Sequence, residues 1–485
     1  MTLTSTSLYQ NGSYINGIWF TEGEDKFPVM NPADGSEITS LCNASSQDAR
    51  LAVAGANASL AGWRSRAAKE KSSLLRKWYG LIIKYQDDLA RIMTTEQGKP
   101  LAEAKAEIIY AANYIDWFAE EAKRIYGDTI PAPSSDKRIV VIKQAIGVVS
   151  AITPWNFPSS MITRKAAPAL AAGCTFLVKP AAETPLSALA LATLAEEAGI
   201  PAGVFNVIVS NKSREIGEVL TKDPTIAKFS FTGSTEVGRK LLEQCSSTVK
   251  KTTMELGGNA PFIVFEDADM DAAIQGAMQS KYRNAGQTCV CSNRIFVQAG
   301  IYDLFAEKLS RHVQALKTDN GLAADVDIGP LVNAGAVDSV DRLVQSAVQS
   351  GATVLTGGKR SALGACFYEP TVLSGVDATM DIATHEIFGP VAPLIRFDRE
   401  QDIIDMANAT EFGLASYIYT RDIGRIWRVA EALEFGMVGI NEGIISNEMA
   451  PFGGIKQSGM GREGSKYGLD DYLEIKYLCM GGLDK

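Results

Sequence analysis

Short apolar runs and helical stretches alternate along the chain, and this pattern predicts an α/β protein. Residues 50–125 are dominated by Ala, Leu and Lys, which predicts helices with an interruption at Gly98-Lys99-Pro100. Beyond them, runs of β-branched residues predict strands at 139–142, 148–152, 175–178, 204–209 and 226–231. An Ala- and Leu-rich helix is expected at 187–198. Such alternation favours a doubly wound, largely parallel sheet.

A second α/β region is predicted from Pro261 to about Asn441. Its expected elements are a strand at 294–298, a helix from residue 302, a helix at 403–409 and a strand at 416–420. The tail, residues 472–480, alternates weakly and predicts a strand that pairs with another part of the molecule. Because ligands bind where parallel strands end, the loops of interest are 153–158, 179–185 and 232–238.

Composition narrows the class of protein. With 485 residues the chain exceeds one ordinary core, so two or three domains are expected. The net charge is −9 and basic residues are scattered, which argues against nucleic acid and an anionic membrane surface as partners but leaves open one anionic ligand held by a few local cations. No apolar run approaches the roughly 18 residues of a membrane span, and the N-terminus resembles no targeting signal. Seven scattered cysteines and two histidines favour a reducing, cytoplasmic setting and no metal site.

Two short segments contain the side chains that a covalent catalyst needs. Cys289 lies in the run at 284–291, and Glu255 lies in the Gly-rich run at 254–261. A thiolate can attack a carbonyl carbon and hold the acyl group until a carboxylate activates water. The alternative is that Cys289 is only a buried structural thiol, since free cysteine is among the most buried residue types.

Two further features follow predicted strands. The segment Gly233–Gly238 precedes a helix, but Arg239 and Lys240 follow it where a P-loop requires Lys and then Ser or Thr. It is either a tight turn or a helix N-terminus that receives a phosphate. Lys179 either binds ribose hydroxyls or a phosphate, or is a solvated surface lysine.

Six motifs occur in a characteristic order. They are Thr153-Pro-Trp-Asn156, Phe231-Thr-Gly-Ser234, Met254-Glu-Leu-Gly-Gly258, Gly286-Gln-Thr-Cys289, Glu386-Ile-Phe-Gly-Pro390 and Pro451-Phe-Gly-Gly-Ile-Lys-Gln-Ser458. In order and spacing they resemble the NAD(P)-dependent aldehyde dehydrogenase superfamily over roughly residues 10 to 480. The resemblance implies a Rossmann-type cofactor-binding domain (1–126 and 146–256) and an α/β catalytic domain (257–458). It also implies a small β oligomerisation element (127–145 and 459–485), and hence a homodimer or homotetramer.

The resemblance implies roles for three catalytic residues. Cys289 is expected to attack the aldehyde, and Asn156 and the Cys289 N–H to stabilise the resulting oxyanion. After hydride transfer leaves a thioester, Glu255 is expected to activate the hydrolytic water. Burial should therefore raise the pKa of Glu255, whereas the pKa of Cys289 should be lowered.

Cofactor contacts are implied in the same way. Trp155, Lys179, Gly233 and Ser234 match cofactor-contact positions, and two residues match positions near the nicotinamide and its ribose, Glu386 and Phe388. Relatives that favour NAD often carry Glu three residues after the lysine. Here Ala182 occupies that position and Glu183 follows it, which favours NADP while leaving NAD open.

Three residues resemble the substrate site of the succinate-semialdehyde dehydrogenase branch. Arg164, Arg283 and Ser446 match positions that hold the substrate carboxylate, and Arg is well suited to such binding. Alternatively, both arginines form structural salt bridges. Glutarate semialdehyde, one methylene longer, would be discriminated by only about 1–3 kcal/mol. A broader aldehyde dehydrogenase or a CoA-acylating enzyme is also considered, although a water-activating Glu255 argues against the latter.

Cys291 lies two residues after the candidate nucleophile. It is either a small filler or, as in a redox switch of the same branch, the partner of a reversible Cys289–Cys291 disulfide. Two other readings are weaker. A non-catalytic scaffold predicts loss of Cys289, Glu255 or Asn156, yet all three are present, and nucleotide hydrolysis would depend on Gly233–Gly238 alone.

Overall fold

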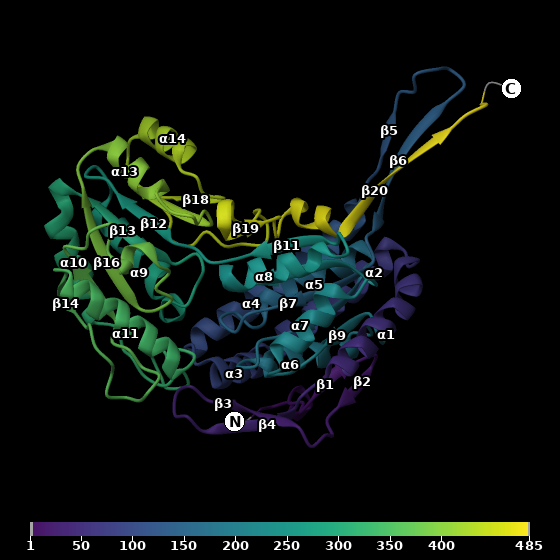
Figure 1. Cartoon of the computed structure of the whole chain (residues 1–485), viewed down its shortest axis with the longest axis horizontal. Helices are drawn as coiled ribbons and strands as arrows, with labels where there is room; N and C mark the ends of the chain where they lie inside the picture. The colour runs from purple at the N-terminus through teal and green to yellow at the C-terminus, as the bar shows by residue number, and fades with distance from the viewer. Residues whose placement is uncertain (1–2, 484–485) are drawn as a thin grey trace.

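The computed structural model describes residues 3–483, which form two α/β lobes and a projecting β arm (Figure 1). The purple-to-teal lobe contains an eight-stranded sheet, and the green lobe contains a seven-stranded sheet. Each sheet contributes strands to its own cluster of buried apolar side chains. The α/β fold class predicted from the sequence is confirmed.

In the first sheet, the order of the strands indicates where a ligand would bind. Its strands are β1 (Ser13–Ile15), β2 (Ile18–Phe20), β7 (Val148–Ile152), β8 (Thr175–Lys179), β9 (Phe205–Val207), β10 (Ile226–Thr232), β11 (Lys251–Glu255) and β19 (Gly459–Met460). They lie in the order β19-β11-β10-β7-β8-β9-β1-β2, and β11, β10, β7, β8 and β9 are parallel. The chain moves from β7 to β8 on one side and later to β10 on the other. The loop after β7 therefore lies at the topological switch point, where such sheets bind ligands.

Helices cover both faces of this sheet. They are α1 (Ser46–Arg64), α2 (Ala68–Lys84), α3 (Gln86–Gln97), α4 (Leu101–Glu121), α5 (Ser160–Ala172), α6 (Pro185–Glu197), α7 (Ser213–Lys222) and α8 (Thr235–Ser246). Every residue of α5 is buried, because this helix packs against α2, α4 and β8. The interruption expected near residue 98 is confirmed, since Gly98 ends α3 in a left-handed conformation and Pro100 precedes α4.

The second lobe is built around a sheet of order β14-β15-β16-β13-β12-β17-β18. Its strands are β12 (Ala260–Val264), β13 (Ser292–Gln298), β14 (Thr353–Thr356), β15 (Thr371–Ser374), β16 (Val391–Phe397), β17 (Ala415–Tyr419) and β18 (Met437–Ile440). All neighbours are parallel except β14 and β15. The helices are α9 (Met270–Tyr282), α10 (Tyr302–Gln314), α11 (Ala334–Gln349), α12 (Asp381–Thr384), α13 (Glu400–Asn408) and α14 (Ile423–Ala432).

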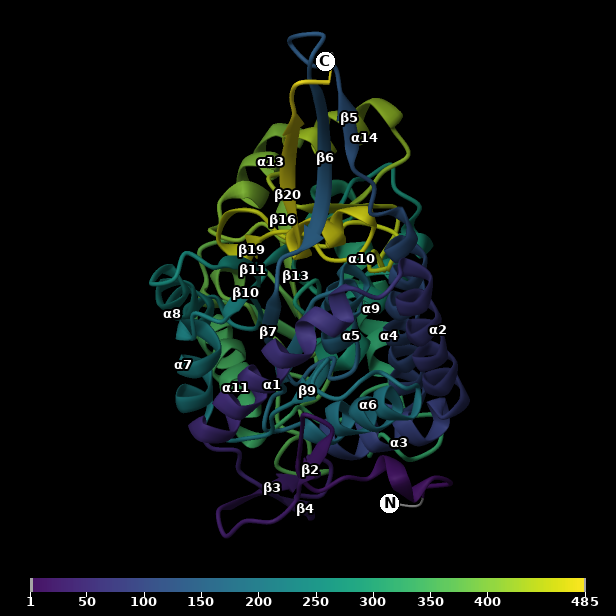
Figure 2. The same cartoon turned by 90° about the vertical axis from the view of Figure 1, so that its right-hand side faces the viewer.

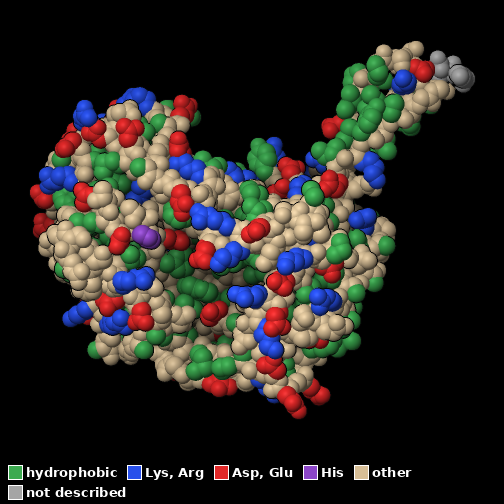
Figure 3. All heavy atoms as spheres, viewed as in Figure 1, with side chains coloured by type: hydrophobic (Ala, Val, Ile, Leu, Met, Phe, Trp, Pro, Cys, Tyr) green, Lys and Arg blue, Asp and Glu red, His purple; other side chains and the backbone are tan. Residues whose placement is uncertain are grey.

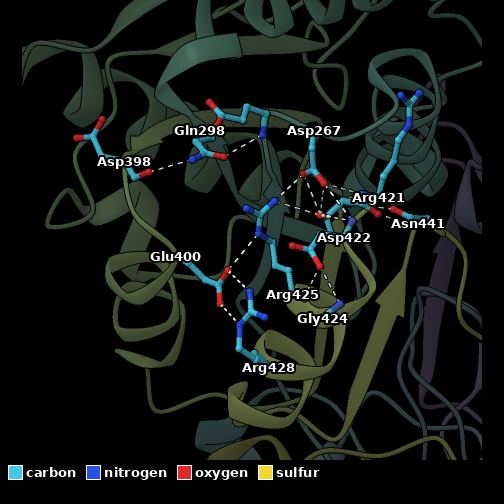
Figure 4. A network of polar contacts seen from close by, with 12 residues as sticks. Asp267, Gln298, Asp398, Glu400, Arg421, Asp422, Gly424, Arg425, Arg428 and Asn441 are labelled. Atoms are coloured by element: carbon cyan, nitrogen blue, oxygen red, sulfur yellow. Dashed lines mark hydrogen bonds and ion pairs between the residues drawn. The ribbon is translucent and has the colours of Figure 1, made fainter.

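A polar network fixes the start of α14 against the carboxyl end of the second sheet (Figure 4). Asp267 accepts hydrogen bonds from the Arg421 and Asp422 backbone N–H groups, both at 3.0 Å, and from Arg425 Nη1 at 2.7 Å. Glu400 then pairs with Arg425 at 3.1 Å and with Arg428 at 2.7 Å. The network holds α14 so that its apolar residues Ile423 and Trp427 remain exposed.

A three-stranded arm rises from the body. It contains β5 (Asp128–Ile130), β6 (Arg138–Ala145) and β20 (Leu473–Met480) in the order β20-β6-β5. Figure 1 shows the arm projecting away from the body, and Figure 2 shows the same three strands from end to end with the C-terminal end of β20 toward the tip. The C-terminal strand expected at 472–480 is thus present, and its partner is β6 in antiparallel register. However, β19 pairs with β11 in the first sheet, so the start of the expected 459–485 segment belongs to the body.

The first 45 residues were not predicted to contain strands. They hold β1, β2 and the hairpin of β3 (Lys26–Met30) and β4 (Glu37–Cys42). These strands are only three to six residues long. Tyr14 of β1 pairs with Val207 of β9, and a pairing so distant in sequence leaves no local pattern.

Candidate active site

The nucleophile loop follows α9 through a sharp reversal of the backbone. Asn284, Ala285 and Gly286 have φ values of 52°, 54° and 74°, which lie in the left-handed region. A side chain at Gly286 would clash with the Gly389 carbonyl, because its Cβ would come within 2.1 Å of that oxygen. Similarly, a Cβ at Gly258 would lie 2.4 Å from the carbonyl oxygen of Cys289. The two Gly-rich motifs therefore allow close packing around the cysteine.

Cys289 opens into a cavity of about 130 Å³ between the two lobes. All three predicted substrate residues, Arg164, Arg283 and Ser446, line this cavity together with Cys289. The remaining walls come from α4, α5 and three loops, and they include Lys99, Glu103, Tyr110, Phe157, Met161 and Phe452. The structure thus brings together a sulfur nucleophile, three basic side chains (Lys99, Arg164 and Arg283) and two acidic ones (Glu103 and Glu107) in a small space.

The expected lowering of the Cys289 pKa was wrong for this structure. Burial raises the pKa of the Cys289 thiol to about 12, and the charges of Glu386 and Glu255 add to that effect. Arg164 and Arg283 oppose it. Sequence motifs could not reveal this balance, because it depends on how fully the loop excludes water. The protonated thiol is therefore favoured at neutral pH in this structure.

The side-chain amide of Asn156 is hydrogen-bonded to the nucleophile loop. It follows β7, and its Nδ2 donates to the Gln287 carbonyl oxygen at 2.9 Å. Its own backbone carbonyl accepts from Lys99 Nζ at 2.8 Å and from Asn284 Nδ2 at 3.0 Å. An amide held in this way keeps a second N–H for an oxyanion that forms beside Cys289.

Glu255 ends β11 and is almost completely buried. Neither carboxylate oxygen has a hydrogen-bond partner among residues 3–483. Burial raises the pKa of Glu255 well above its usual range, and the nearby charge of Glu463 raises it further. The raised pKa agrees with the expectation for a base that acts near neutral pH. Gly453 packs close to the Glu255 carboxylate, since a Cβ at Gly453 would lie 3.0 Å from Glu255 Oε1.

Sequence reasoning missed the buried carboxylate of Glu463. It forms an ion pair with Arg164, whose Nε lies 2.6 Å from Glu463 Oε2, and a second ion pair with Lys165. Arg164 also lies over the ring of Phe452, with 4.0 Å from Cζ to the ring centroid. The structural salt bridge considered for Arg164 therefore exists, although Nη2 has no hydrogen-bond partner in the described residues and the side chain still lines the cavity.

Arg283 and Ser446 differ from Arg164. Both side chains are half-buried, and neither has a side-chain hydrogen bond or ion pair within residues 3–483. The Arg283 guanidinium lies 5.4 Å from the ring centroid of Phe157. These donors are therefore available to an anionic group in the cavity, as a carboxylate-binding site requires.

The expected cofactor residues surround the carboxyl ends of β7, β8 and β10. Lys179 is buried rather than solvated, burial lowers its pKa to about 8, and its Nζ donates to the Pro180 carbonyl at 3.1 Å. Ser234 caps α8 by accepting from the Val237 N–H at 3.4 Å. The adjacent Gly233 N–H donates to the Glu255 carbonyl at 3.1 Å, and Ala182 is half-buried.

Aromatic and acidic groups complete this region. Trp155 and Phe388 meet edge to face, with ring centroids 5.6 Å apart. Glu386 Oε1 accepts from the Gly258 N–H at 3.2 Å, and burial raises its pKa to about 7. Hydroxyl groups of Thr153 and Thr232, at the ends of β7 and β10, are buried without partners among the described residues. Such unpaired polar atoms fit a site that binds a polar dinucleotide.

Cys291 is buried and does not line the cavity. Its Sγ accepts a hydrogen bond from Lys281 Nζ at 3.3 Å, and all seven cysteines are free thiols. No group of three or more His, Cys, Asp or Glu side chains within residues 3–483 could hold a metal ion. None of the helices in that range is long and apolar enough to cross a membrane.

Comparison with known proteins agrees with this geometry. The aldehyde dehydrogenase family model matches residues 19–478. The chain is 58% identical to glutarate-semialdehyde dehydrogenase of Pseudomonas aeruginosa, covering 100% of both chains. It is 57% identical to 3-sulfolactaldehyde dehydrogenase of Pseudomonas putida, covering 100% of this chain and 99% of that one.

Two further matches concern succinate semialdehyde. The chain is 57% identical to succinate-semialdehyde dehydrogenase (NADP(+)) of Escherichia coli K12, covering 99% of this chain and 100% of that one. The crystal structure of succinate-semialdehyde dehydrogenase from Burkholderia pseudomallei superposes with a TM-score of 0.98 at 56% identity, covering 99% and 100% of the two chains. The chain therefore belongs to the aldehyde dehydrogenase family.

Proposed function

We propose that the protein oxidises succinate semialdehyde to succinate with NADP+ or NAD+. The observation that carries this proposal is the single cavity shared by Cys289, Arg164, Arg283 and Ser446. A small cavity with a nucleophile and two cations suits a short aldehyde that ends in an anionic group. The similar identities to enzymes named for glutarate semialdehyde and 3-sulfolactaldehyde support the same substrate class and make these aldehydes the main competitors.

The first half-reaction joins the substrate to the protein. Cys289 first passes its proton to solvent water, and the resulting thiolate attacks the aldehyde carbon, whose carbonyl oxygen becomes an oxyanion. The free N–H of the Asn156 amide and the Cys289 backbone N–H donate to that oxygen. Loss of one such donor typically costs about 2.7–4 kcal/mol of transition-state stabilisation. NAD(P)+, when bound, supplies the hydride acceptor, and a thioester remains on Cys289.

The second half-reaction releases the acid. Glu255 takes a proton from water, the resulting hydroxide attacks the thioester carbon, and the Cys289 thiolate leaves. Glu255 can do this only as a carboxylate, and burial together with the Glu463 charge keeps its pKa high. A base with a raised pKa is a stronger proton acceptor once it is ionised. Glu463, which raises the Glu255 pKa, is itself paired with Lys165 and Arg164.

We favour NADP+ as the better cofactor. A carboxylate three residues after Lys179 would repel a 2′-phosphate, and Ala182 cannot do so. Lys179 is held near the end of β8 and has one backbone acceptor, so it retains donors for a ribose or a phosphate. The exposed carboxylate of Glu183 lies one residue further along and leaves NAD+ usable.

The arm supports a homo-oligomer. Its exposed apolar residues include Ile130, Ile475, Tyr477, Leu478 and Met480. Figure 3 shows hydrophobic side chains gathered along the arm. Both outer strands of its sheet, β5 and β20, have a free edge. Exposed apolar surface of this extent, together with unpaired strand edges, is typical of subunit contacts. The boundaries 127–145 and 459–485 remain our proposal for the oligomerisation element, apart from β19.

A redox role for Cys291 also remains a proposal. Lys281 Nζ contacts its sulfur and could stabilise a thiolate there, although burial raises the Cys291 pKa. A Cys289–Cys291 disulfide would block the nucleophile and should be easily reduced, because so short a ring is strained. Loss of activity with peroxide and recovery with a thiol reductant, alongside a disulfide in the mass spectrum, would support it. Unrecovered activity without a disulfide would reject it.

An aldehyde panel tests the proposed function. Formation of reduced cofactor is followed by absorbance with succinate semialdehyde, glutarate semialdehyde, 3-sulfolactaldehyde and butanal. We expect kcat/KM for succinate semialdehyde to be about 10⁴-fold higher than kcat/KM for butanal. It should be only about 10- to 200-fold higher than kcat/KM for glutarate semialdehyde. Addition of CoA should not change the rate. Equal kcat/KM for butanal, or an absolute requirement for CoA, would overturn the proposal.

A further inference from the structure

Lys99 is a buried cation beside the oxyanion site. It lies in the turn between α3 and α4, and only 1% of its side chain is exposed. Its Nζ lies 2.5 Å from Glu107 Oε2, whose side chain is equally buried, and donates to the Asn156 backbone carbonyl at 2.8 Å. The same nitrogen lies 4.1 Å from the ring centroid of Phe157. One amine therefore contacts an anchor on α4 and two consecutive residues after β7.

Glu107 anchors this amine and also holds the start of α5. Its second oxygen accepts from the backbone N–H groups of Ser159 and Ser160 at 3.1 and 3.2 Å. The carboxylate thus links α4 to both ends of the segment 156–160. Because a buried carboxylate with several charge-assisted hydrogen bonds is costly to move, the Lys99 amine has a fixed position.

The Asn156 carbonyl also receives a donor from the nucleophile loop. Asn284 Nδ2 reaches it at 3.0 Å, and Gln97 Nε2 holds Asn284 Oδ1 at 3.0 Å. Gln97 Oε1 in turn accepts a hydrogen bond from the Lys99 backbone N–H at 2.9 Å. The α3–α4 turn therefore connects the Asn156 loop to the Cys289 loop through fully buried hydrogen bonds.

We propose that Lys99 is a positioning residue that acts through Asn156 to orient the oxyanion donor. Two donors on the Asn156 carbonyl fix the plane of that peptide and hence the direction of the side-chain amide. Lys99 also supports one face of the Phe157 ring, while Arg283 lies near the same ring at 5.4 Å. The inference deepens the proposed function and rests on it, because it assumes an oxyanion at Cys289.

Two other roles for Lys99 are separable by experiment. If Lys99 bound the substrate carboxylate directly, its loss would raise KM for anionic aldehydes and spare butanal. If Lys99 only stabilised the fold, its loss would lower the thermal unfolding temperature without a specific effect on turnover. A positioning role predicts a loss in kcat for both aldehydes, because the oxyanion forms with either substrate.

The experiment removes the ion pair as a unit. Lys99→Met alone would leave Glu107 as an unpaired buried charge, which typically costs about 3–5 kcal/mol. The double variant Lys99→Met/Glu107→Gln avoids that cost and keeps an oxygen for the Ser159 and Ser160 N–H groups. Lys250→Met is the matched control, since Lys250 is a buried lysine that donates to two backbone carbonyls outside the cavity.

Each substitution is combined with Asn156→Ala in a double-mutant cycle. The readouts are kcat and KM with succinate semialdehyde and with butanal, the single-turnover rate of reduced-cofactor formation, and the thermal unfolding temperature. We expect Lys99→Met/Glu107→Gln to lower kcat about 10-fold or more for both aldehydes, with little change in KM. In the Asn156→Ala background the further loss should be about 2-fold or less. Lys250→Met should retain wild-type kcat.

The outcomes distinguish the two levels of the argument. The role of Lys99 would be overturned if the kcat losses of Lys99→Met/Glu107→Gln and Asn156→Ala multiplied when the substitutions were combined. Wild-type kcat in a folded Lys99→Met/Glu107→Gln variant would overturn it as well. In both cases the proposed function would stand. If the double variant does not fold, Glu107→Gln alone provides the test, and its kcat loss must likewise vanish in the Asn156→Ala background. Absence of aldehyde oxidation by the wild-type protein would instead overturn the proposed function itself.

Discussion

Arg164 and Glu463 form a buried ion pair, with the guanidinium Nε 2.6 Å from a carboxylate oxygen. The same Glu463 raises the pKa of Glu255, so one carboxylate influences both the candidate substrate cation and the candidate base. Burial is the largest cause of the Glu255 shift, and Arg164 and Lys165 oppose it. The two halves of the proposed reaction would therefore share a common electrostatic element.

This arrangement predicts a shift in the pH profile. In the proposed mechanism, hydrolysis of the thioester needs ionised Glu255, so the rate should rise with pH as this residue loses its proton. Glu463→Gln removes a negative charge and frees two cations nearby, and both changes lower the Glu255 pKa. We expect the rising limb of kcat to move to lower pH. Glu411→Gln, which removes an exposed ion pair with Arg239, should leave the profile in place.

The assigned base predicts a trapped intermediate. Glu255→Gln should still acylate Cys289 but hydrolyse the thioester slowly, so one burst of reduced cofactor should precede a low steady rate. Mass spectrometry of the quenched mixture should find a succinyl group on Cys289, and Cys289→Ala should carry none. Glu236→Gln, on the exposed face of α8, is the matched control. Wild-type turnover by Glu255→Gln would show that another group activates water.

Arg283 provides the cleaner test of substrate binding. It has no ion pair within residues 3–483, so Arg283→Ala should cost little stability. We expect KM for succinate semialdehyde to rise by about 10²-fold or more, because a charged hydrogen bond is lost, with little change for butanal. Arg164→Ala should show the same selectivity but also unfold more easily, since it leaves Glu463 with one cation fewer. Equal changes for both aldehydes would exclude a carboxylate clamp.

Cofactor preference should respond to a single position. Ala182→Glu places a carboxylate three residues after Lys179, where it repels a 2′-phosphate. We expect kcat/KM with NADP+ to fall about 10-fold or more, while the value with NAD+ is kept or improved. Glu183→Gln serves as the control for the neighbouring charge and should favour NADP+ slightly. An unchanged ratio of the two cofactors in Ala182→Glu would reject the ribose contact assigned to this turn.

The arm should control assembly. Ile475→Glu and Tyr477→Glu each place a charge on an apolar strand that is 72% and 60% exposed at these positions in one subunit. We expect smaller particles by light scattering, because a charge in an apolar interface is costly to bury. Ile18→Glu, on an exposed position of β2 at the other end of the body, should keep the wild-type size. Unchanged particles in both arm variants would exclude the arm as the contact.

The sequence was most informative where chemistry and backbone geometry coincide. Cys289 and Glu255 could be noted from their residue types and Gly-rich flanks, whereas the role of Asn156 came only from the resemblance of the six ordered motifs to the aldehyde dehydrogenase superfamily. Glu463 could not be noted, because its partner Lys165 lies 298 residues away and nothing local marks a buried carboxylate. Lys99 was interpreted only as part of a helix interruption. The Cys289 pKa was predicted in the wrong direction, because burial depends on the packing of both lobes.

The cavity that holds Cys289 takes one wall from α5 of the first lobe and another from the loop after α9 of the second. Neither lobe can preserve it alone, so heat inactivation should follow whichever lobe melts first. A tight-binding anionic inhibitor should then stabilise both lobes against thermal unfolding, because its binding energy is lost as soon as either lobe opens.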